Sequence, residues 1–327
     1  MRTVNESRAS TLGIDPTLAE AMELVEARLG ELLGSREPLL TEISAYLVDS
    51  GGKRVRPAVT LMIFRACGGR KFDDIVDVAA ALELIHSATL LHDDIIDNSD
   101  TRRGKDSAFR KFGLANTLVT GDFVFSRAFQ LCARFEEKLI RWAAEACISL
   151  TEGEVMQGRF RNNPAVTLDD YLEIISRKTA SIFETGARTA AYLAEATPAV
   201  VQGMGRCGFN VGMTFQIVDD LLDVEGKVER VGKPIGIDLR DGNPSLPVVL
   251  SLQTDGEVAR VFQNPEPTEA DVQTALSRIR ESGVLDQVRA MAADYAQRAH
   301  DGMKTLRPSA DREQLLQLVD QLMARTD

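Results

Sequence analysis

The sequence is poor in the features that mark disulfide-linked or metal-finger proteins. Its 327 residues contain four cysteines, one tryptophan and only 6% aromatic residues. The cysteines are scattered singly among apolar neighbours, without the close spacing of a zinc site or the density of a disulfide scaffold. We therefore expect reduced thiols in the core of a cytoplasmic protein.

Positive charge is also in deficit. The chain has 38 Lys and Arg against 49 Asp and Glu, a formal net charge of −11. Binding to a nucleic-acid backbone depends on a positive surface, so nucleic acid is not expected as the main partner. A small anionic substrate stays compatible with this balance if positive charge is gathered locally.

Long apolar runs are missing as well. The longest candidate, residues 77–94, is interrupted by Glu83 and His86, and no uninterrupted run reaches the ~20 residues of a membrane span. The first 16 residues lack the apolar core of a secretory signal. We expect no membrane span, and a flexible tail over residues 1–15.

What the sequence has in abundance is helical periodicity. Apolar residues recur at spacings of three and four in most segments, and the few prolines fall between those segments. No repeat or linker rich in Gly, Ser or Pro divides the chain. These patterns predict an all-α fold in which residues 16–327 form a single domain.

The stretch LLHDDIIDNSDTRRG, residues 90–104, places acidic residues at the end of an apolar helix predicted from about Asp73 to Asp97. Asp93 and Asp97 then lie one turn apart on one face, with Asp94 beside them. Carboxylates at a helix C-terminus meet the negative end of its dipole, so a cation should offset them. Hard oxygen ligands without Cys favour Mg²⁺ over zinc, although a solvated helix end is the alternative.

A second stretch, FQIVDDLLDVEG, repeats the DDxxD pattern at Asp219, Asp220 and Asp223. Gln216 stands in i, i+4 register with Asp220. Two such clusters on different helices could clamp a diphosphate through several Mg²⁺ ions. A di-iron carboxylate site is a poorer interpretation, because that design uses Glu and Glu-x-x-His, which are absent at these positions.

Basic residues accompany the acidic clusters, although each run alone is typical of a solvated surface patch. GGKRVRP at residues 51–57 offers cations beside a glycine pair, and Arg102 and Arg103 follow the first cluster. Lys178, next to Thr179, and Lys233 add further candidates. Gathered in an acidic protein, such groups suit a diphosphate held by direct contacts.

Six motifs in this order resemble the trans-isoprenyl diphosphate synthase (polyprenyl synthase) family over about residues 40–250. They are GGKRVRP, ELIHSATLLHDDIIDNSDTRRG, GDFVFSRAF, SRKTASIF, FQIVDDLLDVEG and GKPIGIDLRDGNPSLP. The resemblance implies a bundle of long, mostly antiparallel helices around a deep central cavity, usually as a homodimer. It also implies Mg²⁺-dependent, head-to-tail condensation of isopentenyl diphosphate with an allylic diphosphate.

The resemblance also implies roles for single residues. Asp93 and Asp97 would bind two Mg²⁺ ions and Asp219 a third, with Asp94, Asp220 and Asp223 supporting the metal site. The residues at allylic diphosphate positions are Arg102, Lys178, Thr179, Gln216 and Lys233. The residues at isopentenyl diphosphate positions are Gly52, Lys53, Arg56, His86, Arg103 and Phe215. Many relatives have lysine where this chain has Asn243, so one diphosphate contact is missing or comes from Arg240.

Product length depends on what lies below the first cluster. Ala88 and Thr89 stand about one helical turn before Asp93 and are small. Members that stop at short products often carry an aromatic residue there, so the resemblance implies a longer chain, with Phe129 on the next helix as a candidate floor. Phe129 could equally be plain core.

Other functions remain as alternatives. A shorter-chain farnesyl or geranylgeranyl diphosphate synthase would share every motif. A non-catalytic synthase subunit would keep the fold, but here both DDxxD clusters and both arginines are intact. A Mg²⁺-dependent phosphohydrolase would also explain two acidic clusters, but it would not extend a chain.

Overall fold

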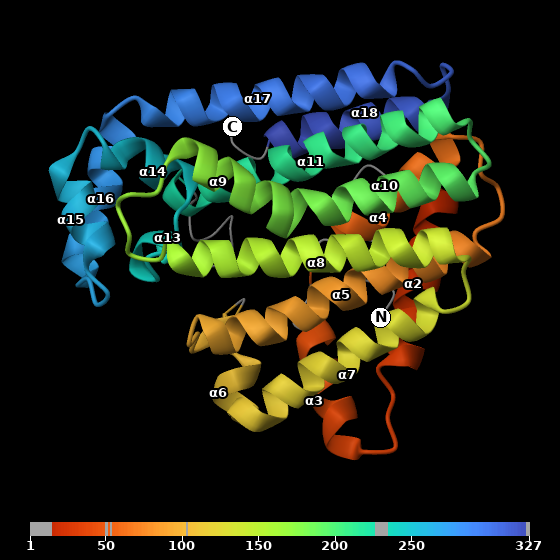
Figure 1. Ribbon diagram of the computed structural model, residues 1–327, viewed down its shortest axis with the longest axis horizontal. Coiled ribbons are helices and arrows are strands. Elements are labelled where there is room, and N and C mark those ends of the chain that lie inside the picture. Colours follow the sequence, from red (N-terminus) through yellow and green to blue (C-terminus); the bar gives the residue numbers. More distant parts are fainter. Residues whose placement is uncertain (1–14, 50–51, 53, 103, 226–234, 325–327) are drawn as a thin grey trace. The chain divides into compact units, whose positions relative to one another are not determined.

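The computed structural model describes residues 15–49, 52, 54–102, 104–225 and 235–324. Within these residues the chain is built from helices, apart from loops and one pair of two-residue strands, which confirms the all-α prediction (Figure 1). The strands β1 (Thr101–Arg102) and β2 (Lys105–Asp106) pair antiparallel. The predicted tail falls almost entirely outside the described residues.

The chain divides into two compact units. Unit 1 comprises residues 1–145, 185–205 and 303–318, and unit 2 comprises residues 146–184, 206–302 and 319–327. The helices wholly in unit 1 are α2 (Pro16–Leu32), α3 (Pro38–Asp49), α4 (Val55–Ala66), α5 (Asp73–Ile96), α6 (Ala108–Phe112) and α7 (Leu114–Cys132). Helices that contribute residues to both units are α8 (Glu137–Arg159), α10 (Ser181–Leu193), α11 (Pro198–Glu225), α17 (Val284–Met303) and α18 (Ala310–Met323).

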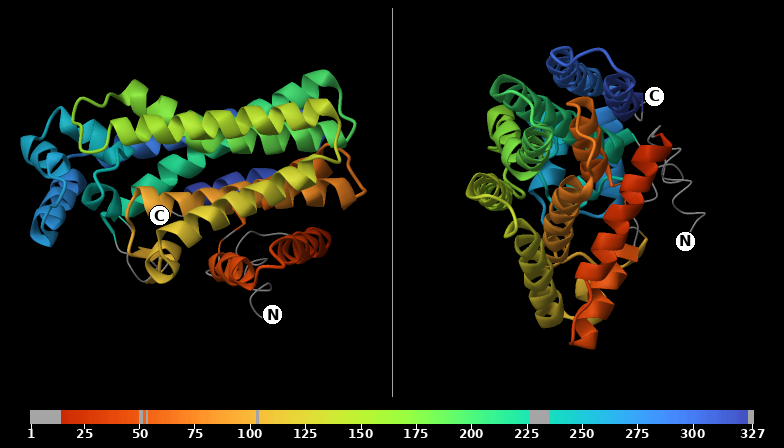
Figure 2. Two further views of the ribbon diagram at one scale, coloured as in Figure 1. Left: turned by 60° about the horizontal axis from the view of Figure 1, so that its bottom comes forward. Right: turned by 90° about the vertical axis from the view of Figure 1, so that its right-hand side faces the viewer.

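Helix α5 is the centre of unit 1. It packs against α2, α4 and α7, and it runs beside α7 in both views (Figures 1 and 2). Asp73 and Asp74 lie in its first turn, where the positive end of the helix dipole stabilises their negative charge. By length and composition α5 could cross a membrane, but 72% of its most apolar window is buried, as in the core helix of a globular protein.

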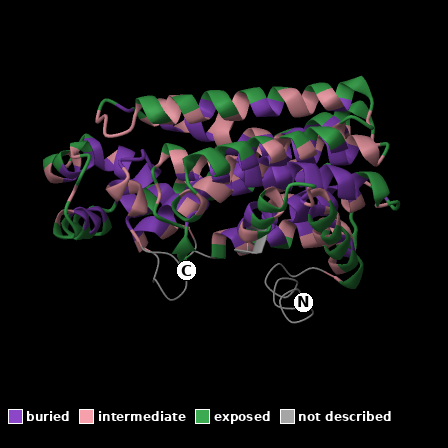
Figure 3. Ribbon diagram, turned by 90° about the horizontal axis from the view of Figure 1, so that it is seen from below, coloured by how far each residue is buried: buried purple, intermediate pink, exposed green. Residues whose placement is uncertain are grey.

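Unit 2 has its own hydrophobic core. Its remaining helices are α9 (Leu168–Ile175), the π-helix η1 (Ser176–Ala180), α13 (Ile237–Arg240), α14 (Leu246–Leu252), α15 (Gly256–Gln263) and α16 (Glu269–Glu281). Tyr171 of α9 and Phe262 of α15 are the largest side chains buried in this core. Figure 3 shows buried residues on the inner faces of the helices and exposed residues on the outer faces.

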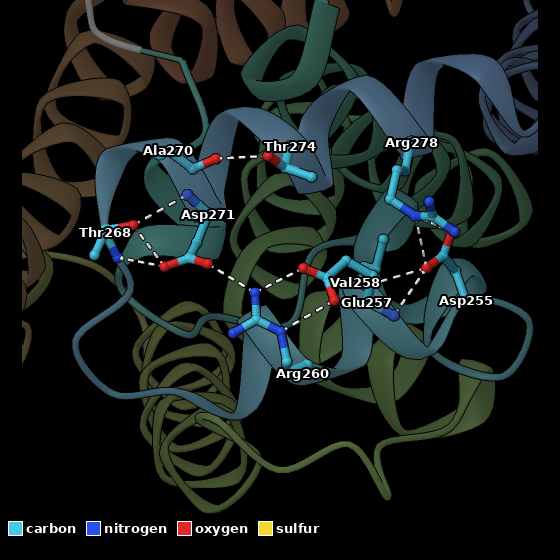
Figure 4. Close-up of polar contacts among 9 residues, drawn as sticks. All are labelled: Asp255, Glu257, Val258, Arg260, Thr268, Ala270, Asp271, Thr274 and Arg278. Carbon is cyan, nitrogen blue, oxygen red and sulfur yellow. Dashed lines mark hydrogen bonds and ion pairs between the residues drawn. The ribbon is translucent and has the colours of Figure 1, made fainter.

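Polar contacts join α15 to α16 on the surface of unit 2 (Figure 4). Asp255 caps α15 and accepts a 2.7 Å bond from Arg278, while Arg260 binds Asp271 at 2.7 Å. Thr268 and Asp271 form a reciprocal capping box at the start of α16, and the Thr268 hydrogen bond is the main cause that lowers the pKa of Asp271 to about 2. Such exposed pairs fix local geometry but contribute little to the free energy of unfolding.

None of the four cysteines forms a disulfide in the described part of the chain, in agreement with the prediction of reduced thiols. Cys147 and Cys207 are buried and Cys67 and Cys132 are half-buried. Burial raises the pKa of Cys67 to about 12 and that of Cys132 to about 11. Both thiols therefore stay protonated and unreactive at neutral pH.

Candidate functional site

The first acidic cluster lies where α5 ends, as the sequence predicts. Asp97 is the C-cap residue, and Asn98 follows it with φ 49°, the left-handed conformation that commonly stops a helix. The turn is closed by the Ser99 amide, which donates to the Asp94 carbonyl at 2.9 Å. Asp93 and Asp97 are half-buried, whereas Asp94 is fully buried.

The buried carboxylate of Asp94 is bound by an arginine of the same chain. Arg102 on strand β1 donates from Nε to Asp94 Oδ1 at 2.5 Å. Burial raises the pKa of Asp94, and the charge and hydrogen bond of Arg102 oppose that rise. The pair therefore holds strand β1 against the end of α5.

His92 adds a contact that the motif had not indicated. Its Nε2 atom lies 3.3 Å from the Leu118 carbonyl oxygen and 3.4 Å from Asp122 Oδ1, both on α7. Gly121 makes room for this ring, because a Cβ atom there would lie only 2.2 Å from Nε2. The glycine of the GDFVFSRAF motif thus allows α7 to approach α5 beside the first cluster.

Three residues predicted to bind isopentenyl diphosphate lie in unit 1 and are described. Gly52 precedes α4, Arg56 is in its first turn, and His86 lies on α5 one turn before Thr89; all three are half-buried. Thr89 Oγ1 donates to the His86 carbonyl at 2.8 Å. The sites predicted at Lys53, Arg103 and Lys233 lie outside the described residues.

The second acidic cluster shows a similar division of roles in unit 2. Asp219 is half-buried, whereas Asp220 is buried and accepts three hydrogen bonds. The donors are Tyr171 Oη at 2.7 Å, the Leu246 amide at 2.9 Å and Gln216 Nε2 at 2.8 Å. Burial raises the pKa of Asp220 to about 6, against the lowering effect of these donors.

Asp223 is also buried and supports the next element of the chain. Its two carboxylate oxygens accept bonds from the Ile237 amide at 3.2 Å and the Asp238 amide at 3.1 Å. These amides are at the N-terminus of α13, which has no other side-chain cap. The third aspartate of the motif thus fixes the segment that leads to Asn243.

Lys178 and Thr179 lie in the π-helix η1, a local widening that is frequent at functional sites. Lys178 Nζ is 2.5 Å from Glu154 and 3.0 Å from Gln157 Oε1, both on α8. Thr179 Oγ1 donates to Gln216 Oε1 at 3.0 Å, so Gln216 links Thr179 to the buried carboxylate of Asp220.

Gly153 explains how α8 comes so close to η1. A Cβ atom at this position would lie 2.6 Å from the Lys178 amide nitrogen. The sequence motifs gave no reason to select Gly153, Glu154 or Gln157. The only signal available is their spacing, since Glu154 and Gln157 share a helix face that contacts a predicted diphosphate ligand.

Arg161 contacts Asn243, the position at which the resemblance led us to expect a lysine. Its Nη2 atom donates to Asn243 Oδ1 at 3.2 Å, and the Asn162 amide donates to the Gly242 carbonyl at 2.9 Å. Arg240, the substitute suggested by the sequence, binds Glu269 at 2.7 Å instead. Sequence reasoning missed Arg161 because it belongs to no motif and its partner is 82 positions away.

An apolar cavity of about 30 Å³ lies along α5 in unit 1. The α5 residues that line it, Val78, Leu82 and Ile85 among them, continue a stripe that passes Thr89 and ends at Asp93. Cys132, Phe135 and Leu139 close the opposite side. Ala88 is fully buried, and Phe129 is 36% exposed on α7 and does not line this cavity.

The donors of the two clusters fit Mg²⁺ in company with a substrate. In the part of the chain that the structure describes, no three or more His, Cys, Asp or Glu side chains are grouped to hold a metal by themselves. Mg²⁺ usually takes one or two carboxylates and completes its shell with water and phosphate oxygens. Half-buried Asp93, Asp97 and Asp219 suit that role better than the buried, hydrogen-bonded aspartates.

The structure therefore brings together Asp94 with Arg102 in unit 1, and Lys178, Thr179, Gln216 and Asp220 in unit 2. Phe215 packs against Phe183 in unit 2, with ring centroids 5.6 Å apart. Each unit by itself thus places a carboxylate near basic or amide groups, a combination that can bind cations and anions.

Comparisons with known proteins identify the family of the chain. The profile of a family described as Polyprenyl synthetase matches residues 37–279. The octaprenyl diphosphate synthase of Escherichia coli is 34% identical over 93% of this chain and 96% of its own length. The geranylgeranyl diphosphate synthase of Methanosarcina mazei is 32% identical over 92% of this chain and 94% of its own length.

Solved structures show the same fold. A polyprenyl synthase from Caulobacter crescentus, complexed with calcium and isoprenyl diphosphate, superposes with a TM-score of 0.91 at 34% identity, covering 98% of each chain. A decaprenyl diphosphate synthase from Rhodobacter capsulatus gives a TM-score of 0.88 at 32% identity, covering 99% of each chain.

Proposed function

The chain belongs to the polyprenyl synthetase family, and from that premise we propose that it is a long-chain polyprenyl diphosphate synthase. It is a prenyltransferase that condenses isopentenyl diphosphate with an allylic diphosphate, repeatedly and with all-trans geometry. The observation that carries the proposal is the pair of DDxxD clusters, each of which begins with a half-buried carboxylate followed by a buried carboxylate that binds the protein.

Asp93, Asp97 and Asp219 would hold Mg²⁺, three ions in all, together with diphosphate oxygens. Bound Mg²⁺ would neutralise the charge that develops on the leaving diphosphate. Asp94, Asp220 and Asp223 have a different task, since their contacts to Arg102, Tyr171 and α13 keep the ends of both cluster helices in place.

The remaining polar residues bind and orient the substrates. Arg102, Lys178 and Arg161 offer cations to the allylic diphosphate, with Thr179 and Gln216 as neutral partners. Gly52, Arg56 and His86 hold isopentenyl diphosphate. Breakage of the allylic carbon–oxygen bond leaves a carbocation, which the double bond of isopentenyl diphosphate attacks, and the departing diphosphate takes the proton that is then lost. No protein nucleophile is needed.

The apolar stripe on α5 below Asp93 supports a long product, whereas the cavity of about 30 Å³ beside it has room for no more than a water-sized group. The α5 residues that line the cavity lie 8 to 15 positions before Asp93, a depth of about 12 to 22 Å at 1.5 Å per residue. An isoprene unit adds four chain bonds, roughly 4 to 5 Å when extended. A product tail that lay along this stripe would pass Thr89 and would be several isoprene units longer than the primer.

We propose a homodimeric, cytoplasmic protein. Leu114, Leu118 and Val119 on α7 are 54%, 43% and 55% exposed, and Phe129 on the same helix is 36% exposed. A run of large apolar side chains on one exposed helix is typical of an interface. A second copy of the chain is the expected partner, because the same face on each copy makes a self-complementary contact about a two-fold axis.

Incubation of the purified protein with radiolabelled isopentenyl diphosphate, Mg²⁺ and farnesyl or geranylgeranyl diphosphate tests the function. We expect dephosphorylated products several isoprene units longer than the primer on thin-layer plates, and none when the metal is chelated. A labelled product that stops at geranylgeraniol with the farnesyl primer, and no labelled product with the geranylgeranyl primer, would indicate a shorter-chain synthase. Release of phosphate without any chain extension would indicate a phosphohydrolase and would contradict the proposal.

A further inference from the structure

Arg54 has an unusual backbone and an unusual environment. It is the N-cap residue of α4, with φ 50° and ψ 38°, the left-handed region that residues other than glycine seldom adopt. Its side chain is only 4% exposed and does not cap the helix. A conformation of this kind persists where surrounding contacts enforce it, and such positions concentrate at functional sites.

Two carboxylates from different helices bind the side chain of Arg54 and hold the residue in this conformation. Arg54 Nη1 donates to Glu83 Oε1 on α5 at 2.8 Å, and Nε donates to Glu26 Oε1 on α2 at 2.7 Å. Both glutamates are mostly buried, with side chains 6% and 24% exposed. Burial alone would lower the pKa of Arg54, but the two carboxylates raise it instead, so the guanidinium keeps its charge.

The register of α5 connects this cluster to the isopentenyl diphosphate residues. Glu83 and His86 are three positions apart and therefore neighbours on one face of α5. Arg56 is two positions after Arg54, in the first turn of α4. The Arg54–Glu83 pair thus fastens the start of α4 to the α5 turn that carries His86.

The same contacts draw the Arg54 side chain away from the N-terminus of α4. Among the described residues no side chain caps this helix, and its first turn has no acidic residue. Backbone amides at such an end attract phosphate oxygens. The Arg54 side chain, drawn toward Glu26 and Glu83, does not occupy that end.

We propose that Arg54 is a positioning residue for isopentenyl diphosphate, held by Glu26 and Glu83 so that the start of α4 and His86 present one diphosphate site. This inference rests on the proposed synthase function and assigns a role to three residues that the motif comparison leaves without one. Arg54 itself does not contact the substrate, because its guanidinium is occupied by the two glutamates.

Arg65 at the other end of α4 offers a matched control. It also joins two carboxylates, Asp15 at 2.7 Å and Asp311, and its side chain is 15% exposed. Arg54→Met and Arg65→Met therefore each remove one mostly buried guanidinium from the same helix and leave two carboxylates without it. Only the first change lies next to the predicted diphosphate residues.

The experiment measures the melting temperature, kcat and both Michaelis constants for wild type, Arg54→Met, Glu83→Gln and Arg65→Met. For Arg54→Met we expect KM for isopentenyl diphosphate to rise on the order of 10-fold, because without the Arg54–Glu83 pair the start of α4 and His86 are no longer held together and one of their charge-assisted contacts to the diphosphate is lost, a loss worth about that factor. KM for the allylic primer should stay within about two-fold, a change below 1 kcal/mol. Arg65→Met should lower the melting temperature comparably and leave both constants near wild type.

Equal effects of Arg54→Met and Arg65→Met on the two Michaelis constants would overturn the proposal and leave Arg54 a purely structural residue. If Arg54→Met does not fold, Glu83→Gln and Glu26→Gln carry the same test, since each keeps the guanidinium and removes one charge that holds it. Wild-type protein that extends no primer would contradict the proposed function itself, an outcome visible before any variant is compared.

Discussion

At the scale of single residues, each acidic cluster contains two kinds of carboxylate. Asp94 and Asp220 are buried and hydrogen-bonded to Arg102 and Tyr171, so their negative charge is shared with the protein. Asp93 and Asp219 precede them by one position and are half-buried. Adjacent helix positions point about 100° apart, which lets one aspartate face a substrate while the next faces the core.

This division predicts different results for neighbouring substitutions. Asp93→Ala and Asp219→Ala should fold with a near-normal melting temperature and lose about 100-fold or more in kcat, because each removes a group that stabilises the leaving diphosphate. Asp286→Ala, at an exposed aspartate on α17 with a side chain 84% exposed, is the control and should stay near wild type. Steady-state kinetics at saturating Mg²⁺ decide the matter, and full activity in both cluster variants would refute the metal assignment.

Arg161 allows a test by rescue. Arg161→Ala should raise KM for the allylic primer on the order of 10-fold, because it removes a cation beside the diphosphate. Adding Asn243→Lys should restore much of the loss, since it puts a cation back at the partner position, 3.2 Å from Arg161 in the native chain. Arg240→Ala, which breaks only the pair with Glu269, should leave this constant unchanged. Failure of the double variant to improve on Arg161→Ala would show that Arg161 acts through local structure.

At the scale of elements, helix boundaries were predictable where the signals are local. The sequence predicts a helix from about Asp73 to Asp97, and α5 runs from Asp73 to Ile96 with Asp97 as its cap. The π-helix at Ser176–Ala180 was not predicted, because its extra residue per turn leaves no mark in a period of three and four. The approach of α8 to Lys178 at Gly153 was equally hidden, since it depends on tertiary contact.

Helix α5 should set the length of the product. Aromatic side chains placed at different depths along it should stop the growing chain at different lengths. Thr89 lies one turn below Asp93, and Leu82 lies about 10 Å further down the same stripe. The substitutions Thr89→Phe and Leu82→Phe therefore place a ring at two depths. We expect Thr89→Phe to release the shortest products and Leu82→Phe products of intermediate length, both with an intact first condensation. Ala88→Phe, beside Thr89, should also shorten the product.

Overpacking could cost about 1–3 kcal/mol at these sites, so the melting temperature is measured beside the product profile. Leu84→Phe is the matched control, because Leu84 is buried on α5, as Leu82 is, but points to the other side of the helix. Its products should keep the wild-type length. Folded, active Thr89→Phe and Leu82→Phe enzymes with unchanged products would show that the tail follows another path.

At the scale of the whole molecule, the family and the all-helical fold followed from six motifs and a helical period, and the comparisons confirm both. The arrangement of a single domain stays a prediction. Some groups could not be predicted from the sequence. Tyr171 and Arg161 are examples, and their partners are 49 and 82 positions away. Separations of that size carry no periodic signal, so only the folded chain brings such residues to the site.

The last prediction concerns the exposed apolar face of α7 and the assembly of two copies. Leu118 is 43% exposed there, and its carbonyl oxygen lies 3.3 Å from His92 beside the first acidic cluster. Leu118→Glu would put a charge into the contact between copies, where burial without a partner is costly. We expect wild type to sediment as a dimer and Leu118→Glu as a monomer, with kcat reduced because α7 supports the end of α5.

Leu24→Glu provides the matched control, because Leu24 is 53% exposed on α2, a different helix of unit 1. This variant should keep the dimeric mass and the wild-type rate. Sedimentation equilibrium over a range of protein concentrations separates the two results, since a weakened dimer dissociates on dilution. A wild-type protein that is monomeric throughout, or a Leu118→Glu variant with the wild-type mass, would show that this face of α7 does not join two copies of the chain.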